Sequence, residues 1–343
     1  GGDSNLLIKK LTREGVATIS QAEFLNQLSQ LFKKTIAVCG AHGKTTASAL
    51  LSYALIKLGV NPTYIVGTSS FDEYPAGDFQ SKEYLVLEAD EYGINPPTDR
   101  TPKFYYLHPT LTLCTNIDFD HPDVFDSIDD VVKAYEKFFK QSEGLVVCAD
   151  NERTLETAKR SGLKFEAYGF SEEANTRIIN HEVTSIGSSF DLMKGDNLIQ
   201  GIRTSMYGDH NILNAVGVFL VLQRLGFEDE LIKTAIKDFM GAKRRFEVAH
   251  SKDGLTVVDD YAHHPEEIKA IIKASFERYG MKPVVIFQPH TYSRTQSLLE
   301  EFGSAFSEAE YAYIMPIFAS ARENKDSFTV THEELVSKAK ERG

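Results

Sequence analysis

The stretch TIAVCGAHGKTTASALL, residues 35–51, joins a short apolar run to a helical pattern through a glycine turn. Glycines let backbone N–H groups wrap around a phosphate, and the N-terminus of a helix adds positive partial charge. In such a loop Lys44 neutralises the outer phosphates, and the Thr45 hydroxyl binds Mg²⁺. The usual first glycine of this motif would fall on Val38, so the motif is a shortened variant. The pattern predicts a nucleotide phosphate site; the alternative is a strand–turn–helix with an incidental GKT.

Around this turn, apolar runs alternate with helical patterns, which is typical of a mostly parallel sheet with helices on both faces. Beside the strand at 35–39 we expect strands at 84–90, 110–116 and 144–150, and helices at 44–58 and 128–139. Beyond residue 169 three runs, 176–184, 188–194 and 197–205, predict an antiparallel meander at the sheet edge. A long apolar helix at 211–226 and a second helix ending near 239 follow.

A second α/β pattern begins near residues 243–247, so we place a domain boundary near residue 246. It contains strands at 255–262, 282–289 and 311–318, and helices at 265–280 and 295–309. Residues 1–34 hold a strand-like run at 16–20 and a helix at 21–32, which is too little for a domain. The expected fold class is therefore α/β, a P-loop domain with a mostly parallel sheet and a smaller Rossmann-like C-terminal domain.

Composition excludes several kinds of protein. The 343 residues carry 37 Lys+Arg against 49 Asp+Glu, a net charge of -12, which argues against a nucleic-acid backbone binder. No apolar run approaches the roughly 18 residues that span a bilayer, and the N-terminus lacks a signal-peptide core. The three scattered cysteines, Cys39, Cys114 and Cys148, predict buried thiols in a reducing compartment. We expect a soluble cytoplasmic protein that binds neither nucleic acid nor membrane.

Polar residues follow two of the expected strands, where parallel sheets bind their ligands. EADEY places Glu88, Asp90 and Glu91 at one strand end, and TNIDFDHPD places a second acidic cluster and His121 at another. Hard oxygen ligands beside a phosphate site suit Mg²⁺, so Glu88 is a candidate metal ligand and His121 a further one. The alternative for each residue alone is a solvated loop charge.

Two motifs in the middle of the chain suit nucleotide contacts. HNILNA holds Asn211 and Asn214 at helical i,i+3 spacing, and their amides could meet adenine or phosphate. A helix N-cap formed by Asp209 or Asn211 is the alternative. In KRRFE, residues 243–247, an arginine at the domain junction could bind a γ-phosphate. The alternative is a solvated basic linker, which would have the same sequence pattern.

Two further strand ends lie in the C-terminal part. Within VVDDYAHHPEEI, residues 257–268, we expect an aspartate to bind ribose hydroxyls and Tyr261 or a histidine to stack on a base. A Zn²⁺ site there is disfavoured because adjacent histidines diverge and no cysteine is near. Within VVIFQPHTYSRT, residues 284–295, the side chains of His290, Tyr292 and Arg294 could bind a substrate carboxylate. The alternative is a polar loop without a binding role.

Together these motifs, in the order GAHGKTT, EADE, TNIDFDHPD, HNILNA, KRRFE, DDYAHHP and FQPHTYSRT, resemble the Mur ligases of peptidoglycan synthesis over residues 35–318. The resemblance implies ATP-dependent amide formation: ATP phosphorylates a carboxylate, and an amine attacks the acyl phosphate. DDYAHHP and QPHxYxRT resemble the members that join L-alanine to UDP-N-acetylmuramate. EADEY with FDHPDVFD also resembles members that attach a tripeptide in recycling. A nucleotide-binding module without activity is the other alternative.

The resemblance also assigns residues. It implies catalytic roles for Lys44, Glu88, His121 and Arg245, and Mg²⁺ ligation by Thr45, Glu88 and His121. It implies ATP binding by Gly40, Ala41, His42, Gly43, Lys44, Thr45, Thr46, Asn211, Asn214, Arg245 and Asp260, and amino-acid binding by Tyr261, His263, His290 and Arg294. Thr291 stands where the family usually has arginine. The implied parts are a remnant of a UDP-binding domain (1–34), a central ATP-binding domain (35–246) and a C-terminal domain that ends early (247–343).

Overall fold

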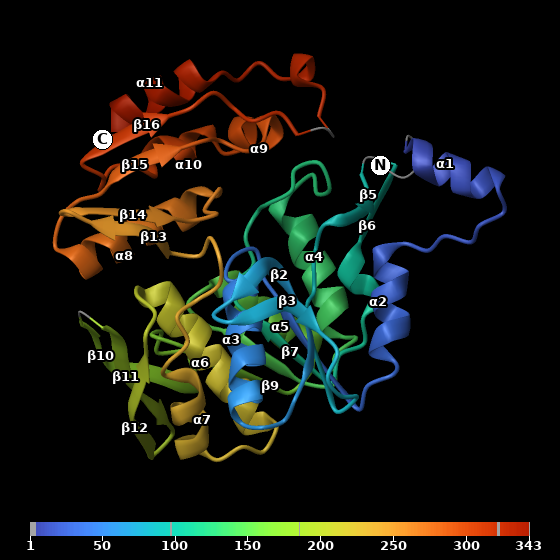
Figure 1. Ribbon diagram of the computed structural model, residues 1–343, viewed down its shortest axis with the longest axis vertical. Coiled ribbons are helices and arrows are strands. Elements are labelled where there is room, and N and C mark those ends of the chain that lie inside the picture. The colour runs from blue at the N-terminus through green and yellow to red at the C-terminus, as the bar shows by residue number, and fades with distance from the viewer. Residues whose placement is uncertain (1–4, 97, 185, 321–322, 343) are drawn as a thin grey trace.

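A ten-stranded sheet forms the centre of the computed structural model, which describes residues 5–96, 98–184, 186–320 and 323–342 (Figure 1). Residues 1–4 of the predicted N-terminal part thus lie outside the described residues. The strand order is β12-β11-β10-β9-β8-β7-β1-β4-β2-β3. The strands are β1 (Lys34–Cys39), β2 (Thr63–Phe71), β3 (Tyr74–Asp78), β4 (Tyr84–Glu88), β7 (Leu111–Cys114), β8 (Leu145–Cys148), β9 (Phe165–Gly169), β10 (Thr176–Thr184), β11 (Gly187–Lys194) and β12 (Asn197–Thr204).

The strands from β2 to β10 across the sheet are parallel, and antiparallel partners close both edges. The predicted meander β10–β12 forms one edge. A hairpin of β2 and β3, which the sequence analysis missed, forms the other. In the middle, β1 pairs with β4 and β7, with Val38 opposite Glu88 and Cys39 opposite Cys114. This register brings the carboxyl ends of the three strands together.

Helices cover both faces of the sheet. On one face lie α3 (Lys44–Lys57), α6 (Asp209–Arg224) and α7 (Asp229–Ile236), and on the other α4 (Ile128–Phe139) and α5 (Glu152–Ser161). Along β1 the side chains alternate between the two cores, with Ile36 and Val38 in one and Ala37 and Cys39 in the other. All three cysteines are free and buried, as predicted.

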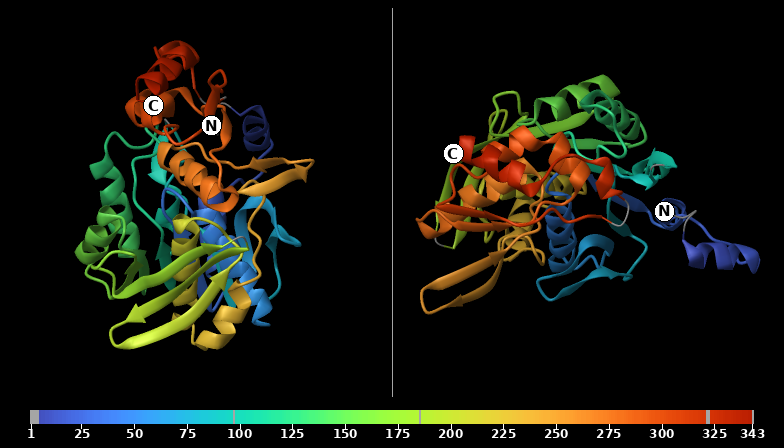
Figure 2. Two further views of the ribbon diagram at one scale, coloured as in Figure 1. Left: turned by 90° about the vertical axis from the view of Figure 1, so that its left-hand side faces the viewer. Right: turned by 90° about the horizontal axis from the view of Figure 1, so that it is seen from above.

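The N-terminal part differs from the prediction. Residues 16–20 form no strand; instead Ser20 caps α2 (Gln21–Ser29), where its hydroxyl accepts the Glu23 N–H at 3.1 Å. The β-branched run favours a strand locally, but none of the described strands pairs with it. Helix α1 (Leu6–Arg13) buries no residue and projects from the body of the molecule (Figures 1 and 2). None of the helices in the described residues has the length and apolar character to cross a membrane.

The C-terminal lobe, which comprises the elements from β13 to α11, lies over the carboxyl ends of the central strands (Figure 1). It contains β13 (Glu247–Lys252), β14 (Leu255–Asp259), β15 (Val284–Phe287), β16 (Tyr311–Ile314), α8 (Pro265–Tyr279), α9 (Tyr292–Ser297), α10 (Leu299–Ser304) and α11 (His332–Arg342). Its small core includes Ile268, Phe287 and Phe302.

Two details of this lobe depart from the prediction. The helix expected at 295–309 is two short helices, because Leu298 leaves helical dihedral angles (φ -118°, ψ 26°). Strand β14 pairs with β13 in an antiparallel hairpin, whereas β15 and β16 pair in parallel. The remaining short elements are β5 (Gly93–Asn95), β6 (Asp99–Pro102) and the 3₁₀ turns Lys103–Tyr106 and Lys325–Ser327.

Candidate functional site

The turn between β1 and α3 has a shape that only glycine permits at two positions. Gly40 has φ 135° and Gly43 has φ 83°, in the left-handed half of the Ramachandran map. A Cβ on Gly40 would overlap Thr115, and one on Gly43 would lie 2.6 Å from Asn214 Oδ1. Gly43 is the N-cap of α3, and none of the described side chains caps this helix. A helix N-terminus left open in this way is suited to bind an anion.

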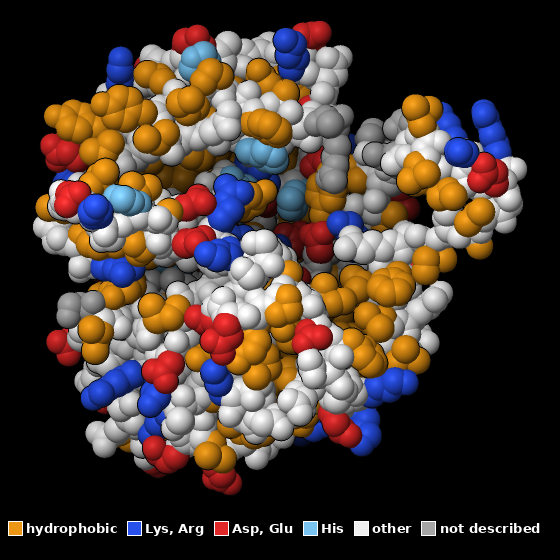
Figure 3. All heavy atoms as spheres, in the orientation of Figure 1, with side chains coloured by type: hydrophobic (Ala, Val, Ile, Leu, Met, Phe, Trp, Pro, Cys, Tyr) orange, Lys and Arg blue, Asp and Glu red, His pale blue; other side chains and the backbone are white. Residues whose placement is uncertain are grey.

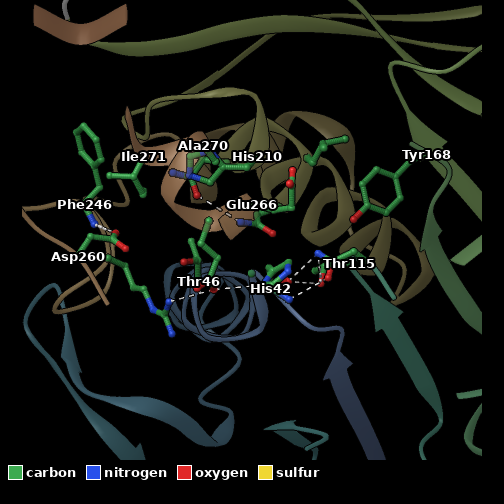
Figure 4. Close-up of a pocket in the computed structure, with 17 residues that line it drawn as sticks. His42, Thr46, Thr115, Tyr168, His210, Phe246, Asp260, Glu266, Ala270 and Ile271 are labelled. Carbon is green, nitrogen blue, oxygen red and sulfur yellow. Dashed lines mark hydrogen bonds and ion pairs between the residues drawn. The ribbon is translucent and has the colours of Figure 1, made fainter. Parts of the chain in front are cut away.

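This turn borders a cavity of about 200 Å³ between the two lobes (Figure 4). Seven of the predicted ATP-binding residues line it: His42, Gly43, Thr46, Asn211, Asn214, Arg245 and Asp260. Gly40 and Ala41 of the turn, and Lys44 and Thr45 at the start of α3, are not among the lining residues. In Figure 4, Asp260 and Tyr168 lie on opposite sides of the cavity. The space-filling view shows acidic, basic and histidine side chains along the hollow between the lobes (Figure 3).

Lys44 turns its ammonium group back into the turn. Its Nζ donates to Gly40 O at 2.6 Å and to both carboxylate oxygens of Glu91 at 2.8 Å. Glu91 is only 3% exposed. Burial disfavours the charged amine, but the Glu91 and Asp90 carboxylates outweigh burial and raise the pKa of Lys44. The lysine is therefore held as a cation beside the uncapped N-terminus of α3.

The carboxylate of Glu88, at the end of β4, accepts hydrogen bonds from oxygen and nitrogen donors. It accepts hydrogen bonds from Gly67 N–H at 2.6 Å, from the Ser48 hydroxyl at 3.2 Å and from the Thr45 hydroxyl at 3.3 Å. The Thr45 and Glu88 oxygens are thus adjacent, as two ligands of one Mg²⁺ would be. Among the described residues, no three His, Cys, Asp or Glu side chains form a ready metal cluster. Such a Mg²⁺ would complete its shell with water and phosphate oxygens.

His121, the third predicted metal ligand, faces other acidic residues. Its Nε2 lies 3.6 Å from Asp120 and 3.8 Å from Glu91. Its backbone is left-handed, with φ 59°, which is uncommon outside glycine. The ring therefore lies near the Lys44–Glu91 pair, and its role as a metal ligand stays a prediction.

Asn211 and Asn214, in the first two turns of α6, line the cavity. Both are nearly buried, with exposures of 7% and 4%. Asn211 Nδ2 donates to Tyr207 O at 2.9 Å, and Asn214 Nδ2 to Asn211 Oδ1 at 3.3 Å. The N-cap of α6 is Gly208, and no side chain in the described part of the chain caps this helix, so neither Asp209 nor Asn211 acts as the cap. The asparagines keep hydrogen-bonding capacity for a ligand.

The junction between the lobes is fixed by Asp260. Its carboxylate accepts the N–H groups of Phe246 and Ala262, each at 2.7 Å. Burial raises the pKa of Asp260 to about 6, against the opposing charge of Arg245. Arg244 and Phe246 have φ values of 57° and 55°, a strained backbone for bulky residues. Such strain at a junction beside a cavity is typical of functional sites.

The four residues predicted to bind the amino-acid substrate fall into two groups. Arg294 binds Asp120 through two hydrogen bonds, at 2.8 and 3.2 Å, and both side chains are nearly buried. Its guanidinium also donates to His290 O, and burial together with Arg294 lowers the pKa of His290.

The other group is Tyr261 and His263, whose ring centroids lie 5.4 Å apart. Tyr261 is 46% exposed and lies beneath the guanidinium of Arg244. Burial lowers the pKa of His263, which faces Glu267 at 3.5 Å.

Three acidic residues of the site were not among the predicted site residues: Glu91, Asp120 and Glu267. Each pairs with a basic side chain that was predicted, namely Lys44, Arg294 and His42. Glu91 and Asp120 were visible in the acidic strand ends, but nothing in the sequence marked which of those acids would be buried. Glu267 carried the weaker signal of an acid in the first turn of a helix.

Comparison with protein families decides the affiliation. The model of the Mur ligase middle domain matches residues 38–222, and that of the Mur ligase glutamate ligase domain matches residues 244–343. The chain belongs to the Mur ligase family. This Mur ligase is 37% identical over 346 residues to the UDP-N-acetylmuramate–L-alanine ligase of Caldanaerobacter subterraneus subsp. tengcongensis. That match covers 99% of this chain and 73% of the relative.

Solved structures share the fold of this Mur ligase. The crystal structure of UDP-N-acetylmuramate–alanine ligase from Thermotoga maritima superposes with a TM-score of 0.80 at 24% identity, over 99% of this chain and 73% of that one. The MurF ligase from Thermotoga maritima, in complex with ADP, gives a TM-score of 0.67 at 18% identity, over 95% and 84% of the two chains. At these identities the structures show the fold alone.

Proposed function

We propose that this Mur ligase joins L-alanine to UDP-N-acetylmuramate in an ATP-dependent reaction of peptidoglycan synthesis. The name and 37% identity of the curated relative support this reaction and favour it over tripeptide recycling. We further propose a boundary near residue 246 between an ATP-binding central domain and a C-terminal domain. The reaction needs an activated carboxylate, because an amine does not displace oxide from a carboxylate at a useful rate.

One observation carries the nucleotide part of the proposal: a single cavity is lined from both lobes. His42, Gly43, Thr46 and Asn214 come from the central lobe, and Asp260 from the C-terminal lobe. The Tyr168 hydroxyl, which also lines it, is buried without a hydrogen-bond partner among the described residues. A buried hydroxyl left unpaired is costly, so a polar ligand would satisfy it. The lining from both lobes and the unpaired hydroxyl support a nucleotide that bridges the lobes.

The charge of each side chain suggests which part of the substrates it would bind. Arg245, which lines the cavity, and Lys44 at the start of α3 would neutralise the phosphates. Asn214 and Asp260, which also line the cavity, would hold base and ribose. Thr45 and Glu88 would hold Mg²⁺, which draws negative charge from the transferring phosphoryl group. His121 and the Arg294–His290 group would face the reacting carboxylate and the amino acid. All of these act by positioning and charge neutralisation, which supply most of the rate in phosphoryl transfer.

The test is release of inorganic phosphate from Mg-ATP by a full-length counterpart of this chain. Coupled ligation predicts release only when UDP-N-acetylmuramate and L-alanine are both present, because the carboxylate accepts the phosphoryl group and the amine then displaces it. Omitting either substrate should abolish steady-state release. Phosphate release that is independent of both substrates would refute the ligase proposal.

A further inference from the structure

The imidazole of His42 lies between two carboxylates that come from different lobes. Its Nδ1 is 3.3 Å from Glu267 Oε1 on α8, in the C-terminal lobe. Its Nε2 is 3.5 Å from Asp118 Oδ2, an ion-pair distance without a well-formed hydrogen bond. The His264 ring lies 4.4 Å away. The middle of the β1–α3 turn is thus attached to the second lobe by a side chain.

Glu267 has two separate roles in this geometry. Its Oε2 accepts the backbone N–H groups of His263 at 2.9 Å and His264 at 3.2 Å, which caps α8. Its Oε1 faces His42, and Arg245 lies at 4.0 Å from the same oxygen. The capping role needs only a hydrogen-bond acceptor, whereas the contact with His42 needs a negative charge. The two roles can therefore be separated by experiment.

The charges of His42, Glu267 and His264 agree with an ionic contact between His42 and Glu267. Burial opposes a charged His42, but Asp118 and Glu267 outweigh it and raise the pKa of His42 to about 10. Burial opposes ionised Glu267 too, but His263 and His42 hold the pKa of Glu267 well below its usual range. His264 is neutral, because burial and the charge of His42 lower its pKa to about 4.

We propose that Glu267 is a positioning residue, which holds the phosphate-binding turn to the C-terminal lobe through His42. Closing the lobes and ordering the turn then become one event. The inference rests on the proposed nucleotide site, because the turn matters only if it binds phosphate. Loss of the charge would raise the population of open lobes and weaken nucleotide binding in proportion, although Glu267 itself need not touch the nucleotide.

The experiment measures the dissociation constant of Mg-ATP by calorimetry for the wild type, Glu267→Gln, His42→Gln and the double variant. Glutamine keeps the α8 cap but removes the charge. We expect each single variant to bind about tenfold more weakly and the double variant to be little worse than either, as for two partners of one interaction. The control is Lys273→Gln, which breaks the exposed pair between α8 and Asp209 of α6 and should leave binding within about twofold.

The pH dependence of the same constant separates positioning from capping. The charged and titratable side chains facing His42 are Asp118, Glu267 and His264. In the wild type, His42 stays protonated below its pKa of about 10. Without Glu267 that pKa falls, so in Glu267→Gln the imidazolium deprotonates as pH rises. We expect affinity in this variant to decline at a lower pH than in the wild type, whose affinity stays level until the pH approaches about 10.

The results of these binding experiments test the proposed nucleotide site and the proposed role of Glu267 separately. If the wild type does not bind Mg-ATP, the proposed nucleotide site is wrong. If the wild type binds and Glu267→Gln binds equally well at every pH, Glu267 is only a helix cap and the inference is overturned. Additive losses in the double variant would also overturn it, because His42 and Glu267 would then act independently.

Discussion

At the scale of single residues, the ion pair between half-buried Lys44 and buried Glu91 is the most informative contact. Its 2.8 Å bonds fix the ammonium group where the open N-terminus of α3 also attracts anions. A bound phosphate would share this lysine with Glu91, so the carboxylate presets the position of the cation and keeps it charged. Positioned in this way, the charge needs no reorganisation when the phosphoryl group transfers.

Replacing Lys44 by alanine should lower turnover by about 100-fold or more, the typical effect of losing one positioned charge in a closed site. Turnover is measured as phosphate release with saturating substrates. Lys57→Ala is the matched control, because Lys57 ends the same helix and pairs with the surface residue Glu73. Unchanged turnover in Lys44→Ala would contradict the assignment of the turn to phosphates.

At the scale of elements, the β1–α3 turn and helix α6 fit together without spare room. Gly43 has φ 83°, and its missing side chain makes space for Asn214 of α6. The turn and the asparagine face the same cavity. Any side chain at position 43 would therefore displace a predicted nucleotide ligand as well as strain the backbone.

Gly43→Ala should lower the free energy of unfolding by about 1–3 kcal/mol and weaken Mg-ATP binding by at least about tenfold. Gly59→Ala separates the two causes: Gly59 also has positive φ, 75°, but open space surrounds its Cβ position. We expect a stability loss of about 1 kcal/mol and normal binding in that control. Denaturant titration and calorimetry measure both quantities. Equal binding by the two variants would show that contact with Asn214 is unimportant.

At the scale of the whole molecule, a buried ion pair joins the two lobes beside the cavity. Arg294 of α9 binds Asp120, which follows β7, and the side chains are 7% and 5% exposed. Arginine forms two parallel bonds to this carboxylate, so the pair fixes an orientation as well as a distance. Together with the contact between His42 and Glu267, it sets how the lobes face each other.

Asp120→Asn should lower the free energy of unfolding by about 3 kcal/mol, because the guanidinium would stay buried without a counter-charge. Asp126→Asn removes the same charge from an exposed pair with Arg100 and should cost below about 1 kcal/mol. Denaturant unfolding of both variants provides the comparison. A loss in Asp120→Asn no larger than in the control would mean that the lobes are held elsewhere.

Most of the sheet could be predicted from sequence because buried parallel strands and their helices leave strong periodic patterns. Residues 16–20 could not, since local β-propensity says nothing about whether a partner strand exists. Within the site, the glycine turn and the asparagines were recognisable as motifs. The pairings Lys44–Glu91, Asp120–Arg294 and His42–Glu267 were not, because each joins residues far apart in the chain and depends on how the elements pack.

The central claim is that one nucleotide is held by both lobes. A crystal structure of the full chain with Mg²⁺ and a non-hydrolysable ATP analogue tests it most directly. We expect the phosphates at the N–H groups of the β1–α3 turn beside Lys44, with Asn214 and Asp260 contacting the same molecule from the two lobes. A nucleotide bound to one lobe alone, or phosphates located away from the turn, would contradict this account.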